Sequence, residues 1–234
     1  EGECINNLKI KIPLKTLNRH GLIAGATGTG KTKTLQVLAE GLSEKSIPVL
    51  LMDIKGDLSG IAKSGTANPK IEERHNKIGE PYNPKAFPVE LLTISDEKGV
   101  RLRATVSEFG PVLFSKILEL NDTQAGIISV IFKYCDDKGL PLLDLKDFKK
   151  VIQYITNEGK TEIEESYGKI STSSTGIILR KIIELEQQKA DLFFGEKSFE
   201  VDDLVRINDE GLGVISILRL IDIQDKPKLF STFM

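Results

Sequence analysis

Residues 25–32, with the sequence GATGTGKT, have the spacing Gly-x-x-x-x-Gly-Lys-Thr. Glycines at positions 25, 28 and 30 allow positive φ angles and let main-chain amides approach an anion closely. In such a loop the lysine ammonium reaches the β- and γ-phosphates of a nucleotide, and the threonine hydroxyl coordinates Mg²⁺. The sequence therefore predicts a nucleotide site, with Thr32 as the metal ligand, formed by Gly25, Ala26, Thr27, Gly28, Thr29, Gly30, Lys31, Thr32 and Lys33.

Hydrolysis of the nucleotide would also need an acid at the end of an apolar strand, and usually a glutamate that polarises the attacking water. Asp53 ends the apolar run VLLMD, one strand–helix–strand unit after Lys31. The carboxyl ends of parallel strands are where ligands bind in open α/β sheets. We therefore predict catalytic roles for Lys31 and Asp53. The alternative for Asp53, an acid that caps the next turn, stays open.

Two other acidic segments are weaker candidates for this role. Asp96 and Glu97 precede a Lys-Gly pair that predicts a solvated turn, and a turn is also expected at Asp222. Neither segment has four apolar residues followed directly by Asp-Glu, so the catalytic glutamate is not visible. A GTPase is disfavoured because NKIG, residues 76–79, lacks the base-binding aspartate, and a nucleoside kinase because no arginine-rich lid is present.

Several elements must position the loop. Leu8–Ile12 alternates apolar and basic residues, as an edge strand does, and His20–Gly25 predicts a short buried strand that runs into the loop. The next segment predicts an amphipathic helix, and Ile47–Ile54 predicts a central parallel strand buried on both faces. Together they form a strand–helix–strand unit of an α/β sheet. The apolar face of the helix is formed by Leu35, Leu38, Ala39 and Leu42.

The remainder of the chain changes from strand to helix patterns and back. Lys63–Pro88 reads as a polar surface excursion with a short helix at Ile71–Ile78, and Phe87–Ser95 and Gly211–Leu218 read as strands. We therefore expect an ATPase core in residues 1–104, a helical insertion in residues 105–208 and a return to the core in residues 209–234. Helices are predicted in Gly110–Leu120, Asn121–Asp137, Asp144–Ile155 and Ser171–Gln188, with Pro111 in a first turn and another helix from Pro227.

Composition limits the classes of function. The net charge of −2 gives no global attraction to nucleic acid or anionic membranes, and no segment resembles a membrane span or signal peptide. Two cysteines and two histidines without paired spacing argue against a zinc site, and Cys135 is expected in the core. We predict a cytoplasmic protein. Because the chain begins with Glu1 and ends within a short helix, we also expect it to be a piece of a longer protein.

Several segments in this order, from about Leu8 to Met234, resemble the bacterial HerA-like ATPases of the helicase HerA-like C-terminal family, within the HerA/FtsK superfamily of P-loop motors. These segments are LNRHGLIAGATGTGKTKTLQVLAEGL, DIKGDLSG, RATVSEFGP, LNDTQAG, LDLKDF, YGKIS, FFGE and GVISIL.

The resemblance implies a P-loop NTPase of α/β class, with a RecA-like, mainly parallel sheet, helices on both faces and a large all-helical insertion. It also implies ATP and Mg²⁺ as cofactors, a homo-oligomeric ring such as a hexamer, and ATP-driven movement of DNA. Asp53 matches the family's acid after the second core strand. Arg19, just before the first strand, is a candidate sensor of phosphate or of a subunit interface, with a plain surface arginine as the alternative.

In the family pattern, a strand ending in Asp-Glu-Ala-His follows the segment that resembles KPKLFSTFM. The catalytic glutamate and an arginine finger are therefore expected beyond Met234, and these 234 residues alone should bind ATP but hydrolyse it slowly. Two functions follow from the sequence. The first is an ATPase motor that acts on DNA as a helicase or translocase. The second is a nucleotide-gated oligomeric scaffold without productive turnover.

Overall fold

The structure, a computed structural model, describes residues 11–233, with side chains through residue 230. Four strands form one sheet in the order β1-β4-β2-β3. Strand β2 pairs in parallel with β3, and Leu92 lies opposite Val100. The fold is of α/β class, as predicted. The strands are β1 (Val49–Asp53), β2 (Val89–Thr93), β3 (Val100–Arg101) and β4 (Ile215–Arg219).

Strand β1 forms where it was predicted, but it is not buried on both faces. Leu51 and Asp53 are buried, whereas Leu50 is 50% exposed and Met52 is 40% exposed. Successive side chains of a strand point to opposite faces, so only one face of β1 is covered in the described chain. Because β1 lies at the edge of the sheet order, the expectation of a central strand is wrong. Strand β4, with four consecutive buried residues, has the burial of a central strand instead.

The chain divides into two compact units, which are treated separately below. The first unit consists of Glu1–Leu51, Asp57–Glu90 and Leu204–Ile217, and the second consists of Met52–Gly56, Leu91–Asp203 and Leu218–Met234.

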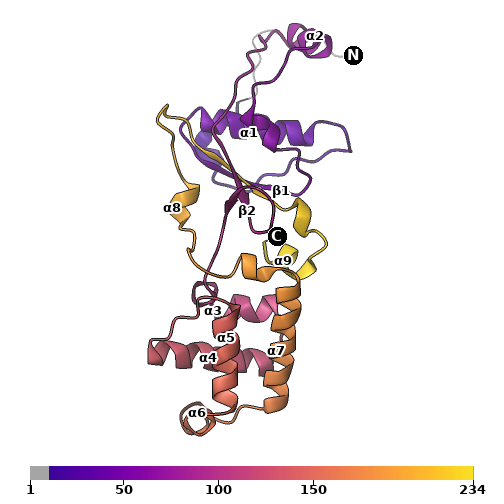
Figure 1. The fold of residues 1–234 in the computed structure, drawn as a ribbon. Coiled ribbons are helices and arrows are strands. Elements are labelled where there is room, and N and C mark those ends of the chain that lie inside the picture. Colours follow the sequence, from indigo (N-terminus) through magenta and orange to yellow (C-terminus); the bar gives the residue numbers. More distant parts are fainter. Residues whose placement is uncertain (1–10, 234) are drawn as a thin grey trace. The chain divides into compact units, whose positions relative to one another are not determined.

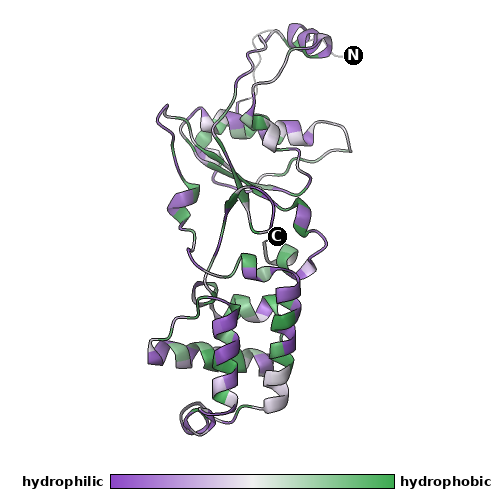
Figure 2. Ribbon diagram, viewed as in Figure 1, coloured by the Kyte–Doolittle hydropathy of each residue, from purple (hydrophilic) through white to green (hydrophobic). Residues whose placement is uncertain are grey.

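The first unit contains the two helices predicted in its sequence. Helix α1 (Lys31–Ser43) begins after Gly30 and buries Ala39 against the core. The Ser43 hydroxyl at its end donates a hydrogen bond of 2.6 Å to the carbonyl of Gly213. Helix α2 (Pro69–Ile78) is capped by Asn68 and buries none of its residues. It is largely hydrophilic in Figure 2, which agrees with the predicted surface excursion.

The second unit contains a group of packed helices, α3 to α7 (Figure 1). Their core includes an aromatic cluster in which the ring centroids of Phe114 and Phe148 are 4.8 Å apart. All four predicted helices of this region are confirmed, whereas α6 was not predicted. The helices are α3 (Val106–Ile117), α4 (Asp122–Lys138), α5 (Leu145–Thr156), α6 (Lys160–Tyr167) and α7 (Thr172–Gln187).

Local capping explains where these helices begin. Thr105 and Asn121 form capping boxes with the residues three positions later, and Asp144 accepts hydrogen bonds from two amides of the first turn of α5. Helix α3 is interrupted at Gly110, which has φ 75° and ψ 165°, and Pro111 then begins its second part. Pro111 is thus in a first helical turn, as predicted.

Short elements complete the described chain. They are η1 (Leu14–Thr16), η2 (Ser59–Ala62), η3 (Ala190–Leu192), α8 (Val201–Leu204), η4 (Ile221–Ile223) and α9 (Pro227–Phe233), the last beginning at the predicted proline. The predicted edge strand at Leu8–Ile12 falls mostly outside the described residues; Ile12 itself is exposed and is not in a strand. Cys135 is buried, as predicted. No helix of the described residues is long and apolar enough to cross a membrane.

Candidate functional site

The loop Gly25–Gly30 has the backbone geometry that an anion cradle requires. Gly28 has φ 83° and Gly30 has φ 98°, in the left-handed region that favours glycine. A side chain at Gly25 would also force the loop to shift, because a Cβ there would lie 2.5 Å from the Thr29 hydroxyl oxygen. The loop is tightened by Thr29, whose amide and hydroxyl both donate to the carbonyl of Ala26, at 3.3 and 2.8 Å.

The Lys31 side chain folds back over this loop. Its ammonium donates a hydrogen bond of 2.8 Å to the carbonyl of Ala26, so the positive charge lies against the loop. Lys31 and Thr32 are half-buried, whereas Lys33 is exposed and donates to the side-chain oxygen of Gln36 at 2.8 Å. A nucleotide phosphate could take the place of the Ala26 carbonyl as the partner of Lys31.

The start of helix α1 adds a second source of positive potential. The first amides of a helix have no intrahelical partner, and the helix dipole places partial positive charge there. Here Gly30 precedes the helix, no side chain caps it, and no acidic residue lies in its first turn. An anion would therefore meet main-chain donors and no competing carboxylate in this first turn.

The segment before the loop differs from its prediction. His20–Gly25 was expected to be a buried strand, yet it forms no strand and its residues are exposed. Leu22 is 90% exposed and Ile23 is 37% exposed. A strand needs main-chain partners alongside it, and none of the described residues supplies them. Arg19, just before this segment, is also exposed and makes no hydrogen bond or ion pair with the described residues.

Asp53 belongs to the second unit and is described with its own neighbours. It ends β1 with 1% exposure, and its Oδ1 accepts a hydrogen bond of 2.7 Å from the amide of Gly56. Gly56 has φ 80°, and a Cβ there would lie 2.5 Å from Cδ1 of Ile221. The Asp53 carbonyl accepts from the amide of Leu220 at 2.9 Å. The Asp53 carboxylate thus holds the turn that follows β1. This is the role of a turn-capping acid, which the sequence left open as the alternative to a catalytic role.

The other acidic candidates are placed as follows. Asp96 is exposed and pairs with Lys189, whose hydrogen bond lowers the pKa of the Asp96 carboxyl. Glu97, in contrast, is half-buried and pairs with Arg219 at the end of β4. The expectation of a solvated turn therefore fits Asp96 but not Glu97. Asp222 lies in the short helix η4 rather than in an open turn.

One residue that supports the loop was not singled out from the sequence. Gln36, on the first turns of α1, is 6% exposed; its amide donates to the carbonyl of Asp57 at 2.9 Å, while its oxygen accepts from Lys33. Gln36 thereby ties the start of α1 to the loop after β1. The sequence did carry a signal for this residue, because Gln36 lies beside the leucines of the apolar helix face. A polar side chain that is buried there needs hydrogen-bond partners.

Residues 2–234 match the family described as Helicase HerA-like C-terminal. The chain belongs to this family. The Helicase HerA-like C-terminal match covers nearly the whole chain and confirms the resemblance stated from the sequence.

Two individual proteins are similar to this member of the family. One is the DNA double-strand break repair helicase HerA of Sulfolobus acidocaldarius, 31% identical over 77 residues, which are 32% of this chain and 16% of that protein. The other is a solved structure, the unbound monoclinic form of the bacterial conjugative coupling protein TrwBdeltaN70. It has a TM-score of 0.44 and 14% identity, over 89% of this chain and 48% of that chain. The matches thus span less than half the length of either protein.

Proposed function

We propose that this chain is the ATP-binding part of a motor that uses ATP hydrolysis to move along or unwind DNA. The observation that carries the proposal is the loop Gly25–Gly30. Its left-handed glycines, the uncapped start of α1 and the ammonium of Lys31 against a loop carbonyl supply what a triphosphate needs.

Each residue of the loop has a role in this proposal. Main-chain amides of residues 26–32 would bind the β-phosphate, Lys31 would neutralise the β- and γ-phosphates, and Thr32 would be the side-chain ligand of Mg²⁺. The hydroxyl of Thr32 suits a hard cation that prefers oxygen ligands. Bound Mg²⁺ would polarise the γ-phosphate and stabilise charge on the phosphate oxygens as the bond to water forms. We propose Asp53 as an acid that assists the metal or the water, and Arg19 as a sensor.

The DNA substrate is inferred from the family. Its description names a helicase, and one relative is named as a DNA repair helicase. With a net charge of −2, the chain has no overall attraction to DNA, so contact would depend on local groups. We further propose that several copies form a ring such as a hexamer, that helices α3 to α7 are an insertion in the ATPase core, and that the protein acts in the cytoplasm.

The test is ATP turnover of the full-length protein, measured as phosphate release with and without duplex DNA. We expect DNA to raise turnover, and Lys31→Ala to abolish it. The matched control is Lys45→Ala, which removes an exposed ammonium two residues after the end of the same helix and should leave turnover unchanged. Turnover that persists in a folded Lys31→Ala protein would refute the assignment of this loop.

A second candidate is a nucleotide-gated scaffold, in which ATP orders an oligomer without productive hydrolysis. The observation that favours it is the use of the Asp53 carboxylate to hold the amide of Gly56, a structural task. ATP-dependent assembly without phosphate release, on DNA or off it, would favour the scaffold. DNA-stimulated phosphate release would favour the motor.

A further inference from the structure

A cavity of about 580 Å³ lies within the second unit. Its lining includes three segments from distant parts of the chain, Arg103 after β3, Leu143–Asp147 at the start of α5, and Phe194–Glu196 after η3, together with Glu186 and Asp191. The three segments are parts of RATVSEFGP, LDLKDF and FFGE, which carry the family resemblance. None of them belongs to the phosphate loop. The volume is within the range of about 300–1,000 Å³ typical of ligand pockets.

The walls of the cavity are joined by main-chain hydrogen bonds. Ala104 donates to Phe193 and accepts from Gly195, at 3.1 and 3.0 Å. The Arg103 guanidinium donates to the carbonyl of Glu196 at 2.9 Å, and a Cβ at Gly195 would lie 3.1 Å from that guanidinium. The glycine therefore lets Arg103 lie against the wall, where its charge is fixed at one side of the cavity.

Five carboxylates and two basic side chains line the cavity. Three of the carboxylates already have partners in the second unit. Asp144 accepts from two amides of α5, Asp147 accepts from the amide of Leu143 at 3.2 Å, and Glu186 accepts twice from Lys149, at 2.7 and 2.8 Å. The other two, Asp191 and Glu196, make no hydrogen bond or ion pair through their carboxylates with any described residue.

We propose that this cavity binds the ammonium or guanidinium group of a cationic ligand between the carboxylates of Asp191 and Glu196. The lining carries more negative than positive charge even after Lys149 neutralises Glu186. Leu145 and Phe194 provide an apolar wall for the methylene stem that such groups carry. Such a ligand has two sources, a free polyamine or a lysine or arginine side chain of a protein segment.

Other ligand classes fit less well. A phosphate would meet five carboxylates against only Arg103 and Lys146. Within the described residues, no three side chains of His, Cys, Asp or Glu are grouped closely enough to hold a metal ion. An organic cation does not need three ligands grouped around one point, because its several N–H donors can reach carboxylates on separate walls of the cavity.

The experiment follows the amide resonances of the ¹⁵N-labelled chain during titration with two probes, spermidine and the capped peptide Gly-Arg-Gly. A capped Gly-Gln-Gly peptide is the neutral control. We expect saturable shifts at Gly195 and Leu145 with at least one cationic probe and none with the neutral peptide. In the double variant Asp191→Asn, Glu196→Gln, binding should weaken by about tenfold or more, because both negatively charged acceptors of the cation are lost. Both side chains are exposed, so the fold should be kept.

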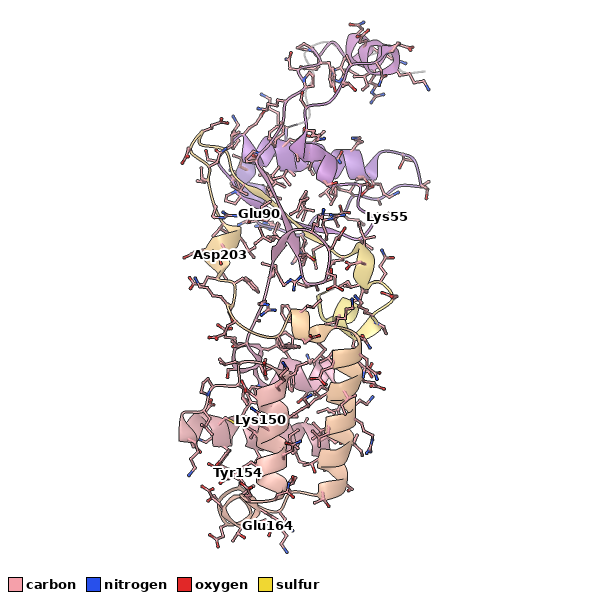
Figure 3. All side chains as sticks on the ribbon, viewed as in Figure 1. Lys55, Glu90, Lys150, Tyr154, Glu164 and Asp203 are labelled. Carbon is pink, nitrogen blue, oxygen red and sulfur yellow. The ribbon has the colours of Figure 1, made fainter. Side chains whose placement is uncertain are left out.

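Two further variants separate the site from general electrostatics. Lys146→Gln removes a positive charge from the lining and should tighten binding by about two- to threefold. Glu164→Gln removes a carboxylate from α6 that does not line the cavity (Figure 3) and should change nothing. Tighter binding of spermidine would identify a polyamine, and tighter binding of the arginine peptide a protein segment. Absence of saturable shifts with both probes, or equal binding by the double variant, would overturn the proposal.

Discussion

Replacing Asp53 with alanine and with asparagine separates its two possible roles. In the structure its Oδ1 accepts from the amide of Gly56 at 2.7 Å, and the residue is 1% exposed. Alanine removes the acceptor and leaves the Gly56 amide without it. Asparagine keeps an oxygen in the same place but removes the negative charge that a metal or water role would need.

The magnitude follows from the hydrogen bond between the Asp53 carboxylate and the Gly56 amide. A hydrogen bond to a charged group contributes about 1.5–3 kcal/mol, and an unpaired buried donor costs about 1–3 kcal/mol. We therefore expect Asp53→Ala to lower the free energy of unfolding by about 2 kcal/mol. Asp53→Asn should lower it by less than about 1 kcal/mol, because a neutral acceptor replaces a charged one. Asp57→Ala, at an exposed acid nearby in sequence, should change it by less than about 0.5 kcal/mol.

The assay is urea denaturation of each variant followed by circular dichroism, together with ATP turnover of the full-length protein that carries the same substitutions. If Asp53→Asn is as unstable as Asp53→Ala, the acceptor is not what matters and the turn-holding account is refuted. If Asp53→Asn is stable but loses turnover, the carboxylate also serves the metal or water. Unchanged turnover in that variant would restrict Asp53 to the turn.

Three further predictions concern the stability of the chain. The hydroxyl of Ser198 donates a hydrogen bond to the Glu108 carboxylate and lowers the pKa of that carboxyl. The hydrogen bond therefore stabilises the folded chain at a pH above the pKa that Glu108 has in the unfolded chain. This stabilisation is lost as the pH falls through the lowered pKa of Glu108 in the folded chain. The unfolding temperature of the native chain should therefore fall more steeply between about pH 5 and about pH 3 than that of Glu108→Gln; parallel curves would contradict this. Gly213→Ala should destabilise the chain, because a Cβ would overlap the carbonyl of Ile47. Gly41→Ala, on an exposed position of α1 with open space around it, should instead stabilise it by about 0.5–1 kcal/mol in thermal unfolding, and loss of stability there would contradict the packing described.

Elements with local signals could be predicted from the sequence. The capping residues Asn121 and Asp144 mark where two helices begin, and the apolar runs that became β2 and β4 have strand length and composition. Helix α3 begins earlier than the predicted Gly110, because its cap is Thr105. Helix α6 was missed because it is short and buries only Ile163, so it has little apolar periodicity.

Burial depends on partners that are distant in the sequence. His20–Gly25 and Ile47–Ile54 have similar apolar character, yet the first is exposed and the second forms a strand with one exposed face. An apolar run predicts extended backbone but does not say which strands lie beside it. The partial burial of Glu97 could not be predicted for the same reason, because its ion-pair partner Arg219 is distant in the sequence.

The candidate site was predictable only where it depends on local sequence and not on contacts between distant residues. The glycine spacing of the phosphate loop is a local property, and it predicted the positive φ angles of Gly28 and Gly30, whereas Gly25 has no positive φ. Its position at the end of a strand identified Asp53 from the sequence. The hydrogen bond that its carboxylate accepts from the Gly56 amide is visible only in the structure. The hydrogen bond from the Gln36 side chain to the Asp57 carbonyl joins two segments that β1 separates in the sequence. No pattern of residue spacing predicts such a contact.

The central claim is that the loop Gly25–Gly30 and Lys31 bind ATP. The most direct measurement is calorimetric titration of the chain with Mg²⁺–ATP, alongside Lys31→Ala and the control Lys45→Ala. We expect saturable binding by the native chain and by Lys45→Ala. Binding to Lys31→Ala should be weaker by about tenfold or more, because a charged contact to phosphate is lost. A folded chain that does not bind ATP, or equal affinity in Lys31→Ala, would contradict the account.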